Sequence, residues 1–185
     1  MSSSVEFLKR FLNSPSSIGS IAPSSAALVA SMMAPIDWRD TQTIVELGAG
    51  TGVITQAIND SRSDESVFIS FENDDQMHAE LKLRFPDVMI GHDAFRLSGI
   101  LQQHGHDQVD CVVSGLPFAN FDRYQQFGLI TTIHEVLRPG GLFIAFQYSL
   151  QLQGYLRSVF ADVDSRFVVR NIPPAFVYVC SKQIQ

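Results

Sequence analysis

An α/β fold, with a mainly parallel sheet covered by helices on both faces, is the architecture that this 185-residue sequence predicts. Short β-branched apolar runs alternate with helix-length segments from Thr43 onward. Such alternation indicates crossover helices between parallel strands, and these helices cover both faces of a sheet. The chain length and the 45% of hydrophobic residues suit one domain with a sizeable core, spanning residues 1–185.

The alternating pattern predicts a seven-stranded, Rossmann-like sheet. Each of the first five strands is followed by a helix, whereas only "IPPA" separates the last two. Because four residues cannot hold a crossover helix, the last two strands must pair antiparallel or diverge at the edge of the sheet. The expected strands are 43–48, 66–72, 88–92, 108–115, 141–149, 163–171 and 175–182, with helices from about 53 and at 75–84, 96–103, 122–137 and 150–160.

A helical extension, residues 1–36, precedes the alternating pattern. Apolar residues recur at helical spacing over 5–12, which predicts a short amphipathic helix ending near Pro15. A loop of small residues follows, and a second helix is expected to run from Pro23, or the serines after it, through Met33.

The charge of the chain weighs against nucleic acid as a partner. Its formal net charge is −6 and its pI about 5.2, which disfavours a mainly electrostatic grip on phosphate backbones or anionic lipids. Cys111 and Cys180 lie in strand-like runs without metal-ligand spacing. We therefore expect buried, reduced thiols, no metal site and a cytoplasmic location.

The chain has no window of about 18 consecutive apolar residues and no basic start followed by an uninterrupted apolar core. We therefore expect a protein that is soluble or bound peripherally to a membrane.

A glycine-rich loop, "VELGAGTG", follows the first predicted strand. Glycines at such a turn let a ligand lie against bare backbone. The dinucleotide fingerprint requires a glycine where Val53 stands, so it is not met. The G-x-G-x-G spacing, with an acid two residues before the first glycine, is instead typical of S-adenosylmethionine (SAM) methyltransferases. The predicted cofactor-binding residues here are Glu46, Gly48, Ala49, Gly50 and Gly52.

Two further acids support a SAM site. Glu72, followed by Asn73, ends the second strand, where a carboxylate can accept both ribose hydroxyls of a nucleotide. Asp93 follows the third strand and is placed to accept from the adenine amino group, while Ala94 offers a backbone N–H to the ring. Because all these residues follow carboxyl ends of strands, they meet in the crevice where such sheets bind ligands.

The methyl acceptor is expected at "SGLPF", residues 114–118, after the fourth strand. Base methyltransferases often have Asn where Gly115 stands, and its amide oxygen accepts from the exocyclic amine of the base. Without that side chain, the backbone carbonyls of Ser114 and Gly115 remain as hydrogen-bond acceptors. Aromatic surface is supplied by Phe118, Phe121 and Tyr124. The alternative is that these rings pack in the core. Aromatic faces hold cationic amines, so this loop favours an alkylamine substrate.

The expected mechanism is attack of a neutral amine on the SAM methyl group, for which alignment matters more than a strong base. Tyr148, at the end of the fifth strand, is the candidate for contacting the amine or a lipid phosphate. The predicted catalytic residues are Tyr148, Ser114 and Phe118, and Ser114 is also predicted to bind the cofactor.

Several motifs make the chain resemble bacterial phospholipid N-methyltransferases, which methylate phosphatidylethanolamine. They are "FLKRFLNSPSSIGSIAPSS", "VELGAGTGVIT", "SGLPFANF", "LRPGGLFIAFQYS" and "VVRNIPPAFVYV". The resemblance implies a SAM-dependent N-methyltransferase of the cytoplasm, peripheral on the inner face of the membrane. It also implies that helix 5–12 lies on the membrane and that loop 18–24 closes over the cofactor.

Four alternatives remain open. With only Lys9 and Arg10 as cations, helix 5–12 could equally dock on its own domain. The substrate could be another small or lipid amine. The chain could be an rRNA adenine N6-dimethyltransferase, which shares the "SP…IG" loop, although Gly115 and the acidic net charge oppose this function. A SAM-binding regulator without turnover is also compatible with the sequence.

Overall fold

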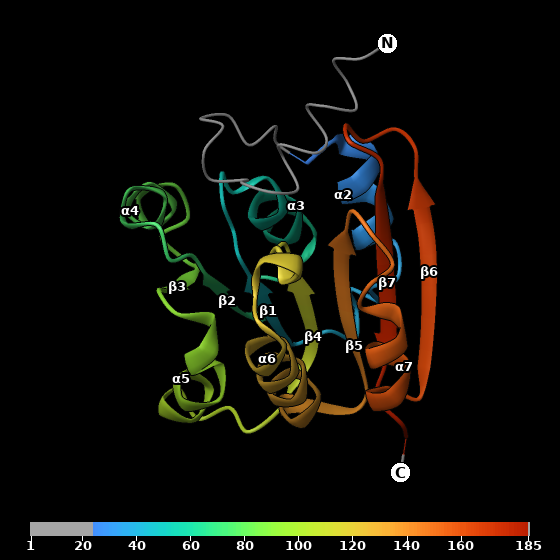
Figure 1. Cartoon of the computed structure of the whole chain (residues 1–185). Helices are drawn as coiled ribbons and strands as arrows, with labels where there is room; N and C mark the ends of the chain where they lie inside the picture. Colours follow the sequence, from blue (N-terminus) through green and yellow to red (C-terminus); the bar gives the residue numbers. More distant parts are fainter. Residues whose placement is uncertain (1–23, 185) are drawn as a thin grey trace.

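The computed structural model describes residues 24–184, in which a seven-stranded sheet forms the centre of a layered α/β fold (Figure 1). The strand order is β3-β2-β1-β4-β5-β7-β6. The first five strands are parallel, and β7 pairs antiparallel with both β5 and β6. The predicted fold class is confirmed, including the antiparallel final pair. The strands are β1 (Thr43–Leu47), β2 (Val67–Phe71), β3 (Met89–Gly91), β4 (Val109–Ser114), β5 (Leu137–Gln147), β6 (Asp162–Val168) and β7 (Ala175–Ser181).

Helices cover both faces of this sheet, as the alternating pattern predicts. One hydrophobic cluster joins buried residues of α2, α3 and α4 to one face, and a second joins those of α5, α6 and α7 to the other. No helix of residues 24–184 is long and apolar enough to cross a membrane. The helices are α2 (Ala26–Met33), α3 (Val53–Ser61), α4 (Asp75–Arg84), α5 (Leu97–Gln103), α6 (Arg123–Val136) and α7 (Gln153–Val159).

Helix α2 is the part of the predicted N-terminal extension that the structure describes. The Ser25 side chain caps it by accepting from the Leu28 N–H, and Leu28 and Met32 are fully buried against the sheet. The helix is therefore part of the core. The predicted helix 5–12, and the predicted lid except for Ser24, lie outside the described residues.

Strand β5 begins four residues before its predicted start at Gly141. The "LRPGG" segment resembles a helix stop followed by a turn, yet Leu137 is buried and already pairs with Val109 of β4. The register then jumps, so that Cys111 pairs with Leu142, and Gly140 takes a positive φ of 75° in the intervening bulge. The predicted turn is thus a bulge within one strand, because β5 pairs with β4 both before and after it.

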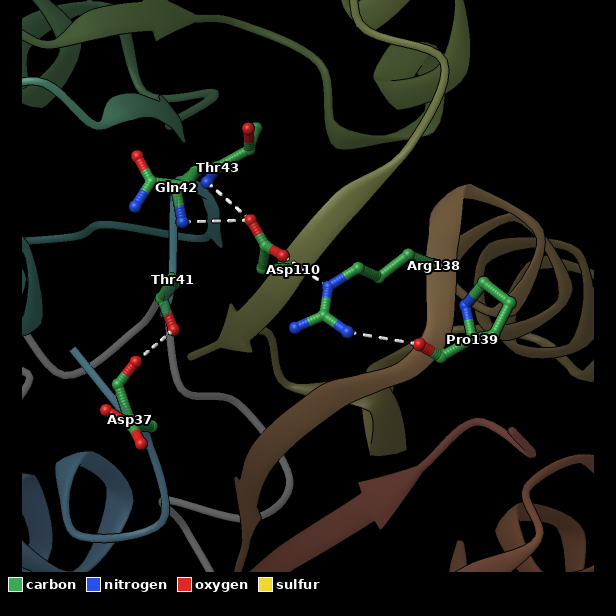
Figure 2. A network of polar contacts seen from close by, with 7 residues as sticks. All are labelled: Asp37, Thr41, Gln42, Thr43, Asp110, Arg138 and Pro139. Atoms are coloured by element: carbon green, nitrogen blue, oxygen red, sulfur yellow. Dashed lines mark hydrogen bonds and ion pairs between the residues drawn. The ribbon is translucent and has the colours of Figure 1, made fainter. Parts of the chain in front are cut away.

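A carboxylate ties three strands together at the amino end of the parallel sheet (Figure 2). Asp110 Oδ2 accepts from the backbone N–H groups of Gln42 at 2.9 Å and Thr43 at 2.8 Å, and Oδ1 accepts from the Arg138 guanidinium. Although burial opposes ionisation, the Arg138 hydrogen bond and these two N–H groups hold the pKa of Asp110 below its ordinary value. The network therefore fixes the starts of β1 and β5 around β4, away from the carboxyl ends where ligands bind.

Replacing this carboxylate should destabilise the fold in a pH-dependent way. A carboxyl group with a depressed folded-state pKa stabilises above its unfolded pKa, and this contribution is lost as the pH falls through the folded-state pKa. We expect Asp110→Asn to lower the free energy of unfolding by about 1–3 kcal/mol near neutral pH and by less in acid. Urea denaturation across pH measures this, with exposed Asp107→Asn as the control. An equal loss at every pH would contradict it.

Candidate functional site

The glycine loop lies between β1 and α3, at the point where the strand order reverses between β1 and β4. Gly48, Gly50 and Gly52 all have positive φ angles, between 55° and 80°, which side chains disfavour. The Arg84 guanidinium of α4 donates to the carbonyls of Thr51 at 2.9 Å and Gly52 at 3.1 Å. The loop is therefore held in one shape at the crevice where open α/β sheets bind ligands.

Glu72, the acid predicted to hold the ribose, is hydrogen-bonded to this loop. Its Oε2 accepts from the Gly50 N–H at 2.6 Å, and its Oε1 accepts from the Asp74 N–H at 2.9 Å. Apart from its chain neighbours, no described residue has an atom within 4 Å of the point where a Cβ on Gly50 would stand. A carboxylate thus adjoins bare backbone, which fits a nucleoside ligand.

The predicted adenine contacts follow the neighbouring strand. The Glu72 N–H donates to the Gly91 carbonyl at 2.9 Å, so the ends of β2 and β3 lie side by side. Asp93 is exposed, and its side chain caps a short 3-10 helix (Ala94–Arg96) by accepting from the Phe95 N–H at 2.9 Å. Asn73 is also exposed. The structure therefore brings Glu72, Asp93 and the glycine loop to adjacent strand ends.

Glu46 is fully buried beneath the glycine loop. Its Oε2 accepts from Thr55 Oγ1 at 2.7 Å and Ser70 Oγ at 2.6 Å, whereas its Oε1 has no hydrogen-bond partner within residues 24–184. Burial raises the pKa of Glu46 to about 7, against the effect of the two hydroxyl donors. A buried oxygen without a donor fits a cofactor that carries an ammonium group, as SAM does.

The acceptor loop, residues 114–118, packs directly against the glycine loop. The Gly115 N–H donates to the Leu47 carbonyl at 2.9 Å. A Cβ on Gly115 would lie only 2.8 Å from the Gly48 carbonyl oxygen, and a Cβ on Gly48 would lie 2.8 Å from Leu116 Cδ2. Because this approach excludes any side chain at position 115, the asparagine of base methyltransferases does not fit here.

Two glutamine side chains, which the sequence patterns do not single out, hold the acceptor loop. Gln147 Nε2 donates to the Leu116 carbonyl at 2.9 Å, and Gln126 Nε2 donates to the Phe118 carbonyl at 2.8 Å and the Phe121 carbonyl at 2.9 Å. Gln147 is 31 residues from Leu116, so no local spacing signals the contact. The loop conformation is thus fixed from β5 and α6.

Ser114 serves the same loop. Its side chain is buried, and its Oγ accepts from the Leu116 N–H at 3.2 Å. The hydroxyl therefore stabilises the turn that follows β4, while the residue lies at the strand end predicted for the acceptor.

Phe118 does not lie where its predicted substrate-contacting role requires. Its side chain is fully buried and makes edge-to-face contacts with Phe121 and Phe143, at centroid distances of 5.8 and 6.4 Å. Burial of apolar surface explains this position, since the ring completes the core beneath α6. Phe121 is half-buried, and Tyr124 is 88% exposed. The ring therefore packs in the core, the alternative that the sequence left open, and its predicted contact with a substrate stays a prediction that this position does not favour.

Tyr148 follows β5 at the same edge of the sheet. It is half-buried and makes an edge-to-face contact with Phe146 at a centroid distance of 5.8 Å. Burial raises the pKa of the Tyr148 phenol above its ordinary value, so the group stays protonated at neutral pH. It can therefore donate or accept a hydrogen bond at the rim of the site.

Comparison with known proteins agrees with this geometry. A family model described as "Methyltransferase small domain" matches residues 14–170. An ornithine lipid N-methyltransferase from Singulisphaera acidiphila is 38% identical over 180 residues, covering 94% of this chain and 93% of that protein.

Solved structures support the fold. The 1,6-didemethyltoxoflavin-N1-methyltransferase of Burkholderia thailandensis, solved with S-adenosylhomocysteine, aligns with a TM-score of 0.68 at 16% identity, covering 97% of this chain and 86% of that one. A putative rRNA methylase from Clostridium thermocellum aligns with a TM-score of 0.61 at 15% identity, covering 78% and 88%. At such identities the likeness concerns the fold alone.

Fold and site together define a Rossmann-like, SAM-dependent methyltransferase. The chain belongs to the methyltransferase small domain family. The predicted cofactor, SAM, and the predicted enzyme class, a SAM-dependent N-methyltransferase, are confirmed. The resemblance found in the sequence is therefore confirmed as membership of a SAM-dependent methyltransferase family. It is not confirmed as membership of a family specific for phosphatidylethanolamine.

The buried carboxyl group of Glu46 should make the stability of the cofactor-free protein depend on pH. Because its pKa rises from 4.5 to about 7 on folding, the free energy of unfolding should fall as the pH rises through this window. Between about pH 5 and about pH 8, we expect the free energy of unfolding to fall by roughly 2–3 kcal/mol less in Glu46→Gln than in the unmodified protein. Urea denaturation at about pH 5 and about pH 8 measures it, with Glu80→Gln on α4 as the control. An unchanged pH slope in Glu46→Gln would contradict the assignment.

The contact between the two loops should couple position 115 to cofactor binding. We expect Gly115→Ala and Gly115→Asn both to weaken SAM binding by roughly tenfold or more, since either Cβ displaces the Gly48 carbonyl. Isothermal titration with SAM measures the affinity. Gly128→Ala on α6 is the matched control, because its Cβ position meets no atom within 4 Å apart from its chain neighbours and the adjacent backbone of its own helix. Normal affinity in Gly115→Ala would disprove the steric coupling.

Proposed function

We propose that this enzyme transfers methyl groups from SAM to the primary amine of a membrane aminolipid. The observation that carries the proposal is the contact between Gly115 and the Gly48 carbonyl, which leaves the acceptor loop without a side chain for recognising a base. An alkylamine needs no such group, because its nitrogen becomes a good nucleophile once it loses its proton. The 38% identical relative, an ornithine lipid N-methyltransferase, supports a lipid amine.

The proposed substrates are the head-group amine of phosphatidylethanolamine, which the sequence resemblance implies, and the amine of an ornithine lipid, which the relative's name suggests. Both present an amine at the lipid head group. They differ in what surrounds the amine, which is a phosphate diester in the first lipid and a carboxylate in the second.

On the cofactor side, SAM would supply an electrophilic methyl group on its sulfonium. Glu72 would accept the ribose hydroxyls, and Asp93, with the Ala94 N–H and neighbouring Asn73, would hold the adenine. The free Oε1 of Glu46 would accept from the ammonium group. The glycine loop, with Gly48, Ala49, Gly50 and Gly52, would give the cofactor its backbone surface.

On the acceptor side, backbone carbonyls of Ser114 and Gly115 would accept from the amine N–H groups and aim the nitrogen. The glutamine contacts to Leu116 and Phe118 keep these carbonyls in place. Tyr148, protonated at neutral pH, would contact the amine or the head group from β5. Alignment of the amine, rather than proton removal by a strong base, would then provide most of the catalysis.

The enzyme would work in the cytoplasm at the inner face of the membrane, where aminolipids are available. Helix 5–12 would contact the lipid surface, and loop 18–24 would close over the cofactor. The acidic chain argues against RNA as the substrate.

Transfer of labelled methyl from SAM tests this function. Purified enzyme is incubated with phosphatidylethanolamine, with ornithine lipid and with an rRNA transcript in parallel. We expect label in at least one lipid and none in RNA, and preference between the lipids identifies the head group. Label in RNA alone would reject the lipid function, and SAM binding without transfer to any of the three would favour a regulator.

A further inference from the structure

The end of β6 and the turn that follows it carry large apolar side chains that face outward. Phe167, Val169 and Ile172 are 56%, 66% and 80% exposed, whereas Val168 and Ala175 between and beside them are buried in the core. Three exposed large apolar side chains within six residues of sequence make this segment a candidate contact surface. We call Phe167, Val169, Arg170 and Ile172 the hairpin patch.

The hairpin patch stands on a well-held turn. The buried Asn171 side chain donates to the Pro173 carbonyl at 2.7 Å and accepts from the Ser25 N–H at 3.0 Å. The rings of Phe167 and Phe176 pack with centroids 4.8 Å apart. Because the turn is anchored through Asn171, its apolar side chains are presented outward instead of folding back onto the core.

The charge of this segment differs from that of the chain. Residues 165–176 contain Arg166 and Arg170 and no carboxylate, although the whole chain has a net charge of −6. Arg166 pairs with Asp164 at 3.0 Å, and Arg170 is exposed between Val169 and Ile172. A cation among apolar side chains complements an anionic lipid surface, where head groups attract arginine and acyl chains accept apolar groups.

The hairpin patch also lies at the edge of the candidate active site. In the sheet register Phe176 pairs with Gln147, so the turn stands at the carboxyl end of the parallel strands, at the top of Figure 1. The Asn171 side chain, which anchors the turn, lies close enough to Tyr148 to lower the pKa of its phenol against the effect of burial, so the turn adjoins the rim where the acceptor is proposed to bind. A surface touching this turn would therefore also face the entrance used by the substrate.

We propose that the hairpin patch inserts into the interface of an anionic lipid bilayer and orients the active site toward the head groups. This inference rests on the proposed lipid-amine function and adds a contact separate from helix 5–12. Apolar burial of Val169 and Ile172 and attraction of Arg170 to anionic head groups would provide the binding.

A fluorescent label at the tip of the turn tests the insertion. Ile172→Cys in the full-length protein can be labelled selectively with an environment-sensitive fluorophore. Cys111 and Cys180 are buried, and burial raises the pKa of each thiol to about 12. Ile184→Cys is the matched control, because Ile184 is 79% exposed but lies beside Gly140, at the opposite end of β5.

Vesicles of phosphatidylcholine and phosphatidylglycerol should shift the emission of the Ile172 label to the blue, and nitroxide-bearing lipids should quench it. The Ile184 label should do neither. An unchanged Ile172 label on protein that sediments with the vesicles would overturn the proposal, as would absence of sedimentation. A shift that depends on protein concentration without vesicles would identify a second copy as the occupant and overturn it as well.

Replacing two apolar side chains of the hairpin patch by aspartate gives a second test, in which vesicle partitioning is measured. The double variant Val169→Asp, Ile172→Asp should lower vesicle partitioning by roughly tenfold or more, and Ile184→Asp should leave it unchanged. Equal partitioning of the two variants would overturn the proposal.

Lipid dispersed in detergent micelles separates this inference from the proposed function. The double variant should methylate micellar aminolipid as fast as the unmodified enzyme, because the hairpin patch then has no bilayer to bind. Failure of the unmodified enzyme to methylate any micellar aminolipid would reject the proposed function, whereas loss of micellar activity only in the double variant would overturn the hairpin patch as a bilayer contact.

Discussion

The close contact between two loops at the carboxyl edge of the sheet is the constraint on which the site depends. Gly115 approaches the Gly48 carbonyl so closely that a Cβ at position 115 would lie 2.8 Å from the carbonyl oxygen. The glycine loop and the acceptor loop are therefore packed directly against each other. Methyl transfer requires two reactants held in line, and in the proposed function this packing would set the relative positions of the surfaces that hold them.

Long-range polar contacts keep this unit in place from several elements. Arg84 of α4 holds the glycine loop, and Gln147 and Gln126 hold the acceptor loop. Beneath them, Glu46 is buried with one oxygen free, an arrangement that costs stability in the empty protein. In the proposed function the cofactor's ammonium group would satisfy this oxygen, so the cost in stability would serve binding.

The glycine spacing, Glu72 and Asp93 were all predictable, because each belongs to a local pattern at the end of an apolar strand. The structure places them at neighbouring strand ends, as parallel pairing requires. Phe118 and the start of β5 were not predictable in the same way. Whether this aromatic side chain faces a ligand or the core depends on its packing against Phe143 of β5, which lies 25 residues away in the sequence.

The sequence by itself determined the fold class, the cofactor and the order of the elements, since these follow from hydrophobic periodicity and turn residues acting over a few positions. The tertiary structure alone decided why position 115 is glycine. From the sequence, Gly115 is known only as a glycine at the position where base methyltransferases have asparagine. In the fold, glycine is the residue that fits beside the Gly48 carbonyl without displacing it. The physical reason is packing, because the atom that excludes a side chain there comes from a loop 67 residues away.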